Sequence, residues 1–312
     1  MSELRLATFN LYNLGVDIVP ERLARTAALI VSELRAPDIL GVQEVKASDL
    51  PDNAGGLPAA GSFRMLIDAI TRSGGPAYDF CEIPPLPNQD GGQIGFNIRV
   101  GLLYNPQRLA LRRRGDAGPD DATGIYWRQN RVELTLSPGR IDPVNPAFAG
   151  DAKRHWAPSR KALVAEFCFA EKSLFVIVCH LKSMRASSRR ESAYTKKQRH
   201  AQASVIYRFV SHILGCDPQA RVIIVGDMND VPGSKTLSLL TGNLLTNLVE
   251  AVPARVRYTR RHGHQAQALD HILVSKAMRY ATQVNIPHIN SDCADPLRAS
   301  DHDPVLAVVN AA

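Results

Sequence analysis

Carboxylate, amide and imidazole side chains repeatedly follow apolar stretches that have the pattern of buried strands. The stretch RVIIVGDMND (221–230) is apolar or glycine from Val222 to Gly226, and then places Asp227, Asn229 and Asp230 within four positions. One such ending is ordinary, because Asp and Asn are favoured in turns. Five other apolar stretches, however, end or begin with the same residue types, at Asn10, Gln43-Glu44, His180, Asp270 and Ser300-Asp301-His302. Because the ends of adjacent strands meet at one rim of a sheet, we expect these residues to converge on a cleft.

Such a cluster favours a hard divalent cation. Carboxylate and amide oxygens suit Mg²⁺ or Mn²⁺, whereas zinc would want more histidine or cysteine. Two histidines beside carboxylates supply groups that transfer protons or stabilise charge. A divalent ion, an acid that orients water and histidine donors together suit attack on a phosphate ester.

The elements that must position these residues are mostly short strands. Strand patterns cover residues 4–10, 38–44, 78–83, 100–105, 131–136, 161–169, 174–180, 222–227, 269–275 and 304–309. Apolar residues at helical spacing predict helices at 20–35, 196–214 and 233–241. The segments 51–62 and 137–158, rich in Pro and Gly, are typical of long surface loops. Because many strands are apolar on both faces, the pattern predicts two packed sheets with helices outside them.

Length and composition indicate a globular protein with a substantial core. The chain has 312 residues, of which 45% are hydrophobic, and its apolar runs stop far short of the roughly 18 residues that a membrane span needs. Its start, MSELRLATFN, lacks a basic and then apolar leader, so we expect a cytoplasmic protein without membrane contact. The five cysteines are widely spaced, which predicts neither a disulfide framework nor a zinc cluster. The net charge of +7 favours polyanionic partners, and a monomer is the simplest expectation.

Six motifs in chain order resemble those of the endonuclease/exonuclease/phosphatase superfamily, namely ATFNLYN, GVQEV, HLKS, GDMND, LDHILVS and SDHDPV. Each motif is weak alone, but together they extend from Thr8 to Val308. The resemblance implies an α/β fold, a four-layer α/β/β/α sandwich with two mixed β-sheets packed face to face and helices outside, as a single domain over residues 1–312. It also implies a phosphoric ester hydrolase similar to bacterial nuclease-like members of the deoxyribonuclease I and exonuclease III type.

Carried over residue by residue, the resemblance implies a metal site beside an activated water. Glu44 would be the principal ligand of Mg²⁺ or Mn²⁺, with Asn10 and Asp301 close to the ion. Asp227 would orient or deprotonate the attacking water, and Asn229 would hold a phosphate oxygen.

The resemblance also assigns the histidines and two cations. His302, braced by Asp270, would act on the phosphate or the water. His180 matches a family histidine, and Arg160 matches an arginine on the preceding strand that would contact the scissile phosphate. Lys182, just after His180, would touch a neighbouring phosphate or would otherwise be a solvated loop residue.

Two positions depart from the family pattern. In the deoxyribonuclease I branch the histidine that matches His180 contacts a glutamate one strand earlier, where this chain has Ile98. His180 is therefore expected to lack that glutamate partner and to stabilise charge as a neutral hydrogen-bond donor. Asp230 has no matching role, and we expect it to act in a turn or a cap.

Two basic segments bear on the substrate, MRASSRRESAYTKKQRH (184–200) and RVRYTRRHGH (255–264). The first follows His180 and the second leads to Asp270, so we expect both to be flexible loops beside the cleft, with a solvated basic face as the alternative. Such loops suit a nucleic-acid backbone bound through its phosphates. We therefore expect a Mg²⁺- or Mn²⁺-dependent nuclease, acting on DNA as an endo- or exonuclease through in-line attack of water.

Two other functions stay open. One is a phosphatase or phospholipase C-like hydrolase acting on inositol phosphates or sphingomyelin, although the absent leader and the absence of an exposed aromatic hairpin count against a secreted lipase. The other is a non-catalytic binding module, which the presence of every polar site position argues against. Trp127 and Trp156 are expected to be core or loop anchors, and His262 and His264 surface residues.

Overall fold

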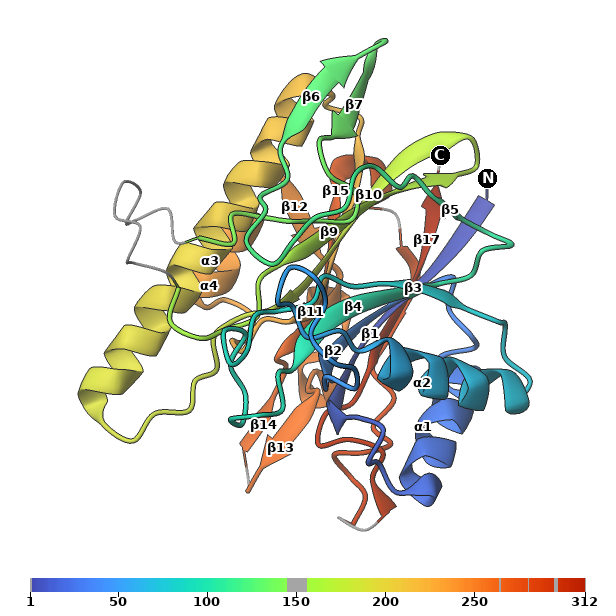
Figure 1. The fold of residues 1–312 in the computed structure, drawn as a ribbon, viewed down its shortest axis with the longest axis vertical. Helices are drawn as coiled ribbons and strands as arrows, with labels where there is room; N and C mark the ends of the chain where they lie inside the picture. Colours follow the sequence, from blue (N-terminus) through green and yellow to red (C-terminus); the bar gives the residue numbers. More distant parts are fainter. Residues whose placement is uncertain (1, 145–155, 264, 280, 295–296, 312) are drawn as a thin grey trace.

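A six-stranded mixed sheet carries the N-terminal half of the site (Figure 1). The computed structural model describes residues 2–144, 156–263, 265–279, 281–294 and 297–311. Within this sheet β1 pairs with β2 in parallel, and the other neighbours are antiparallel. In spatial order its strands are β16 (Ala281–Asn285), β17 (Val305–Ala311), β1 (Ser2–Leu14), β2 (Ile39–Val45), β4 (Arg99–Tyr104) and β3 (Asp79–Cys81).

A seven-stranded mixed sheet packs face to face with the first. Its strands β10 and β11 are parallel, and β11 is buried along its whole length, as expected for a strand covered on both faces. Its path is β12 (Leu245–Asn247), β15 (Asp270–Ser275), β11 (Arg221–Asp227), β10 (Lys172–His180), β9 (Leu163–Phe169) and β5 (Ala110–Leu111), with β8 (Gly139–Arg140) also paired to β9.

Helices cover the outer face of each sheet (Figure 1). α1 (Pro20–Ser32) and α2 (Ala60–Arg72) pack on the six-stranded sheet, whereas α3 (Arg189–Cys216) and α4 (Lys235–Thr241) pack on the other. Three short 3₁₀ helices complete the described part of the chain, η2 (Leu248–Ala251), η3 (Ala254–Val256) and η4 (Lys276–Met278). The order helix, sheet, sheet, helix confirms the predicted four-layer sandwich.

The helix α2 was not predicted. The Gly- and Pro-rich segment 51–62 was interpreted as a loop, but the helix begins inside it at Ala60. Its buried residues Phe63, Leu66 and Ile70 have helical spacing and lie just beyond the loop-like composition. Of the other predicted loop, 137–158, residues 145–155 lie outside the described chain.

Two β-hairpins project from the sandwich, in Figure 1 at its top and bottom ends. β6 (Ile125–Arg128) pairs with β7 (Arg131–Leu134), and β13 (Arg260–His262) pairs with β14 (Gln265–Gln267). Trp127 on β6 is 51% exposed, so the expectation of a core or loop anchor was wrong for it, as was the expectation of no exposed aromatic hairpin. Trp156 is buried, and its Nε1 donates to the Asp142 carbonyl at 3.0 Å, which fits a loop anchor. His262 is exposed as expected, whereas His264 lies outside the described residues.

The two sheets approach closely just beneath the rim that carries the polar residues. A Cβ placed on Gly41 of β2 would lie 2.3 Å from Val225 Cγ2 of β11, so only glycine fits there. Gly226 has φ +145°, and a Cβ there would lie 2.0 Å from the Cys179 carbonyl oxygen. Gly41 thus allows the two sheets to approach beneath the rim, and Gly226 allows β10 and β11 of one sheet to pair closely just before His180 and Asp227.

Candidate active site

Strand register brings three of the predicted residues to one rim of the seven-stranded sheet. His180 ends β10 and pairs with Asp227, the last residue of the parallel strand β11. Asp227 in turn pairs with Asp270, the first residue of the antiparallel strand β15. All three side chains are buried. The apolar strands thus place an imidazole and two carboxylates side by side, as the sequence predicted.

The other sheet contributes Asn10 from β1 and Glu44 from β2 across the interface. Glu44 has a left-handed φ of +61°, at a register shift between β2 and β4, and such a bulge re-aims a side chain. Asn10 Nδ2 donates to Glu44 Oε1 at 3.3 Å and to Asp227 Oδ2 at 3.2 Å. One amide therefore joins the carboxylates of the two sheets.

Asp227 lies at the centre of the cluster. Burial, with the negative charges of Asp270 and Glu44, raises the pKa of Asp227 to about 7. Its Oδ1 accepts the backbone N–H of Asn229 at 2.8 Å, and its Oδ2 lies 3.4 Å from His180 Nε2. A carboxyl group with this pKa can exchange a proton near neutral pH.

His302 and Asp270 form a buried pair, as the family resemblance implied. His302 Nδ1 lies 2.7 Å from Asp270 Oδ2, which also accepts the Thr259 hydroxyl at 2.6 Å. Burial opposes the imidazolium, but the Asp270 carboxylate outweighs it and raises the pKa of His302 to about 10. The free edge of the ring, Nε2, lies 4.0 Å from Asp227 Oδ2. Sequence reasoning missed Thr259, because a threonine within a basic segment carries no signal of a contact with Asp270.

Ile98 lies in the cavity beside His180, where the family pattern has a glutamate, but His180 still has a carboxylate neighbour, because its Nε2 lies 3.4 Å from Asp227 Oδ2. The Nδ1 of His180 is buried and has no hydrogen-bond partner among the described residues. Burial, with the positive charges of Arg160 and His302, lowers the pKa of His180 well below its ordinary value. The ring is therefore neutral at pH 7, and its Nε2 lies 4.0 Å from Glu44 Oε1.

The predicted phosphate-binding residues lie beside this cluster. Arg160 is buried and its Nη2 donates to the Leu181 carbonyl at 3.2 Å, and Asn229 Nδ2 donates to the same carbonyl at 3.1 Å. Lys182 Nζ donates to the Pro158 carbonyl at 3.1 Å, so it is not a freely solvated side chain. Burial, together with the charge of Arg160, lowers the pKa of Lys182.

Asp301 lies on the same rim, where it pairs with a cation that was predicted only as part of a basic segment. Arg260 Nη2 of β13 lies 2.7 Å from Asp301 Oδ2. The preceding residue, Ser300, donates its hydroxyl to the Asn10 carbonyl at 2.6 Å, which fastens this loop to β1. Asp301 is therefore adjacent to the cluster, with its charge shared by Arg260.

These residues surround a cavity of about 610 Å³. Carboxylates, amides and imidazoles line it together with four basic side chains, Arg160, Lys182, Arg185 and Arg260. The predicted residues Glu44, His180, Asp227, Asn229, Asp301 and His302 all line it. The arrangement can bind a phosphate group, neutralise its charge and exchange a proton with water.

The basic segments contribute less to the cavity than expected. Most of 184–200 is not a loop, because α3 begins at Arg189 with the Ser188 hydroxyl as its cap. Arg199 is buried and its Nε lies 3.3 Å from Asp230 Oδ2. Asp230 Oδ2 also accepts the Thr236 hydroxyl at 2.6 Å, so Asp230 has a structural role that links α3 to α4, whereas the cap of α4 is Ser234.

Residues 7–302 match the Endonuclease/Exonuclease/phosphatase family. The chain belongs to this family. Its members are phosphoric ester hydrolases, and the family includes both phosphodiesterases and phosphatases. No curated protein matches the chain. The cavity therefore lies in a hydrolase scaffold whose chemistry is directed at phosphate esters.

Solved structures that share this fold include proteins whose names refer to different substrates. An endonuclease/exonuclease/phosphatase from Bacteroides vulgatus is 18% identical, with a TM-score of 0.60 and full coverage of both chains. TDP2 from D. rerio complexed with a single-strand DNA product is 17% identical, with a TM-score of 0.56, over 99% of this chain and 100% of that one. A mannosyl-6-phosphatase from Bacteroides thetaiotaomicron is 16% identical, with a TM-score of 0.60, over 98% and 99%. These likenesses establish the fold.

The residues of this family member fit a divalent cation, which family enzymes typically require. Asp227, Asp270 and His302 offer ligand atoms that lie within 4.8 Å of one another, and Glu44 reaches Asp227 through Asn10. Glu44, Asp227 and Asp301 also line one cavity. Several carboxylates that face one cavity are a donor set for a hard ion.

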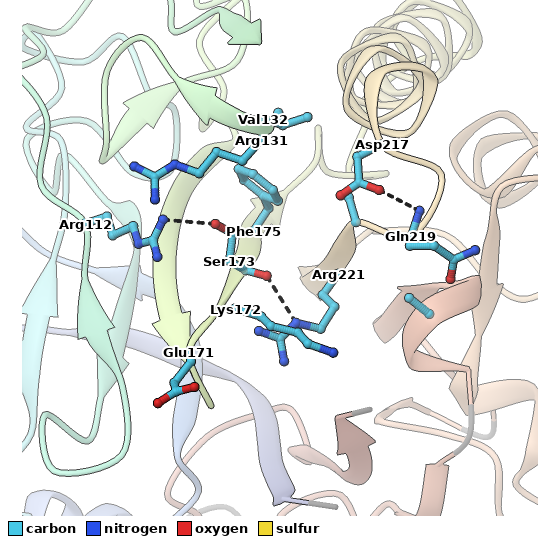
Figure 2. Close-up of a pocket in the computed structure, with 12 residues that line it drawn as sticks. Arg112, Arg131, Val132, Glu171, Lys172, Ser173, Phe175, Asp217, Gln219 and Arg221 are labelled. Carbon is cyan, nitrogen blue, oxygen red and sulfur yellow. Dashed lines mark hydrogen bonds between the residues drawn. The ribbon is translucent and has the colours of Figure 1, made fainter. Parts of the chain in front are cut away.

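A second cavity, of about 540 Å³, lies at the opposite end of the strands β10 and β11 (Figure 2). Its guanidinium groups are engaged within the protein. Arg112 Nη1 contacts Glu166 Oε1 at 3.2 Å and the Ser173 hydroxyl at 3.1 Å, and Arg221 donates to the carbonyls of Ser173 and Phe169. No helix in the described residues is long and apolar enough to cross a membrane.

Proposed function

We propose that the protein is a Mg²⁺- or Mn²⁺-dependent phosphodiesterase that hydrolyses nucleic acid, with DNA as the substrate, through in-line attack of water. The observation that carries this proposal is a cavity lined by four basic side chains together with Asp227 and His302 of the buried cluster. Basic side chains bind a polyanionic backbone through its phosphates, and phosphate contacts of this kind bind without reading sequence. The net charge of +7 also favours a polyanionic substrate.

Glu44, Asn10 and Asp301 would hold the cation, which would supply charge neutralisation at the phosphate when bound. Asp227 orients the attacking water and accepts its proton, since its pKa of about 7 matches neutral conditions. His302 is held as an imidazolium by Asp270, so its Nε2 donates to a phosphate oxygen while negative charge develops there.

Neutral His180 and Asn229 donate hydrogen bonds to the remaining phosphate oxygens. Arg160 adds positive charge from a fixed position behind them, because its Nη2 is anchored on the Leu181 carbonyl. Water is the nucleophile in this scheme, so we expect no covalent enzyme intermediate.

A phosphatase acting on a small phosphate ester is the second candidate. The structural likeness to a protein named mannosyl-6-phosphatase favours it as much as the likeness to TDP2 with a DNA product favours a nuclease. A phospholipase is less well supported, because the exposed aromatic hairpin is remote from the site. Val132 of that hairpin lines the cavity at the N-terminal ends of β10 and β11, whereas the site lies at their C-terminal ends.

The deciding experiment compares plasmid nicking and oligonucleotide cleavage with release of inorganic phosphate from sugar and inositol phosphates. Each assay is run with Mg²⁺, Mn²⁺ or chelator. Asp227→Ala should abolish the activity, and Asp68→Ala, at an exposed position of α2, serves as the matched control. Phosphate release without any nucleic-acid cleavage would establish the phosphatase instead.

Two further measurements in the same preparation bear on the mechanism. Cleavage of nucleic acid should weaken steeply with added salt, because cations released from the backbone drive its binding. A wild-type protein that binds no divalent ion and hydrolyses none of the substrates would instead be a non-catalytic binding module.

A further inference from the structure

Tyr12 differs in chemistry from the other residues that line the active-site cavity. Among the described lining residues it is the only one with a phenol or benzene ring, and 46% of it is exposed. It lies two residues after Asn10, whose Oδ1 accepts the Tyr12 backbone N–H at 3.0 Å. An aromatic surface is thus linked directly to the residues that surround the scissile phosphate.

The backbone holds this ring in an unfavourable conformation. Tyr12 and Asn13 have φ values of +48° and +55°, in the left-handed region that residues other than glycine rarely adopt. The pairing of β1 with β2 is shifted over the same stretch, between Asn10 and Leu14. Backbone strain of this kind costs of order 1–3 kcal/mol per residue and collects at functional sites. Burial of the ring does not offset that cost, since nearly half of it remains in water.

Arg22 of α1 fixes the ring from within the protein. Its guanidinium carbon lies 5.4 Å from the centroid of the Tyr12 ring. The same guanidinium donates to the carbonyls of Leu11 and Tyr12 and, through Nε at 2.8 Å, to that of Ala299. Three carbonyls orient the cation, and the cation lies over the Tyr12 ring. The result is an aromatic surface supported by a cation at the edge of a polar site.

We propose that Tyr12 stacks on the base of the nucleotide next to the scissile phosphate, and that the enzyme therefore prefers unpaired nucleic acid. Stacking on a side chain requires a base that has left the duplex stack, as in a single strand or a frayed end. Such stacking tolerates any base, because each offers a flat face. This inference rests on the proposed nuclease function and assigns its substrate class.

Two polymers with the same phosphate backbone test the proposal, oligothymidylate and an oligomer with tetrahydrofuran abasic residues at every position. Tyr12→Ala should lower kcat/KM for oligothymidylate by roughly 5- to 150-fold, the range expected for one lost stack. It should leave cleavage of the abasic oligomer unchanged within a factor of about two, because that substrate has nothing to stack. Tyr12→Trp should retain or increase the preference for oligothymidylate.

Two controls separate stacking from damage to the fold. Tyr12→Asn removes the ring but keeps a residue that tolerates the left-handed backbone, so it should behave as Tyr12→Ala does. Tyr194→Ala removes a ring of similar exposure, 52%, from α3 outside the cavity, and should change neither polymer's cleavage. Equal loss on both polymers in Tyr12→Ala and Tyr12→Asn, or no loss on either, would overturn the stacking role. A wild-type enzyme that cleaves neither polymer would instead refute the nuclease function, and the inference with it.

Discussion

The pair formed by Asp270 and His302 allows a quantitative prediction. Asp270→Asn keeps the shape of the side chain and removes its charge from a contact of 2.7 Å. The rise of the His302 pKa from 6.5 to about 10 corresponds to about 5 kcal/mol in favour of the imidazolium, at about 1.4 kcal/mol per pH unit. Without this carboxylate, burial is the largest influence on the ring and lowers its pKa, and only the charges of Asp227 and Asp301 oppose it. We therefore expect the pKa of His302 to fall below 6.5 in the variant.

The same substitution should change the pH dependence of stability in the metal-free protein. A raised histidine pKa stabilises the native state fully below the unfolded value of about 6.5, and this contribution is lost as the pH rises through about 10. The free energy of unfolding attributable to His302 therefore declines between these two limits in the wild type. This decline should be absent in Asp270→Asn, whose kcat should also fall by roughly 10²- to 10⁴-fold if His302 acts as a charged donor.

The assay is an NMR titration of the ring nitrogens of His302 from pH 5 to 11, combined with urea denaturation over the same range. Asp90→Asn is the matched control, because Asp90 is another buried carboxylate, paired with Arg140 and Lys161. A His302 pKa that stays near 10 in Asp270→Asn would refute the assignment of the shift to this carboxylate. An equal fall in Asp90→Asn would refute its specificity.

Three further predictions concern the fold and the metal. Gly226→Ala should lower the free energy of unfolding, measured by urea denaturation, by about 3 kcal/mol or more, because the new Cβ would clash with the Cys179 carbonyl. The control Gly215→Ala in α3 should be neutral or mildly stabilising. Mg²⁺ or Mn²⁺ should raise the thermal midpoint of the wild type at pH 8 but not that of Glu44→Gln, and an equal rise in both would contradict the ligand assignment. Asp230→Ala should lower the free energy of unfolding by about 1–3 kcal/mol, because Arg199 loses its carboxylate partner. Its kcat should stay within a few-fold of the wild-type value. A large loss of kcat would instead give Asp230 a role in catalysis.

Much of this fold could be predicted from local patterns, because each strand carries its own signal. All ten predicted strands overlap observed ones, since runs such as VIIVG are apolar on both faces and end at turn residues. Among the strands that were not predicted, β5 and β8 are only two residues long and are defined by their pairing with β9. No periodicity can appear in two residues. Their positions therefore depend on tertiary structure alone.

The polar side chains of the site could also be predicted from local patterns, whereas the residues that hold them in position could not. Asp227 and His180 follow strands whose ends must meet at a rim, so their convergence follows from topology. Thr259 and Arg22 act on atoms that are distant in sequence, the Asp270 carboxylate and the Ala299 carbonyl. Neither residue type is unusual at its position. Their roles depend on the angle at which a loop or a helix packs, which no local pattern encodes.

The site is divided between the two sheets, so its geometry depends on how the sheets pack. Asn10 and Glu44 belong to one sheet and Asp227 to the other, yet Asn10 Nδ2 must lie 3.2 Å from Asp227 Oδ2. That distance is set by the contact of the two sheets, where Gly41 leaves no space for a Cβ beside Val225. A packed interface cannot adjust continuously, because interiors are close-packed. The geometry of the candidate metal site is thus fixed by apolar packing beneath it, and the polar residues at the rim add chemistry to a position that the core has already determined.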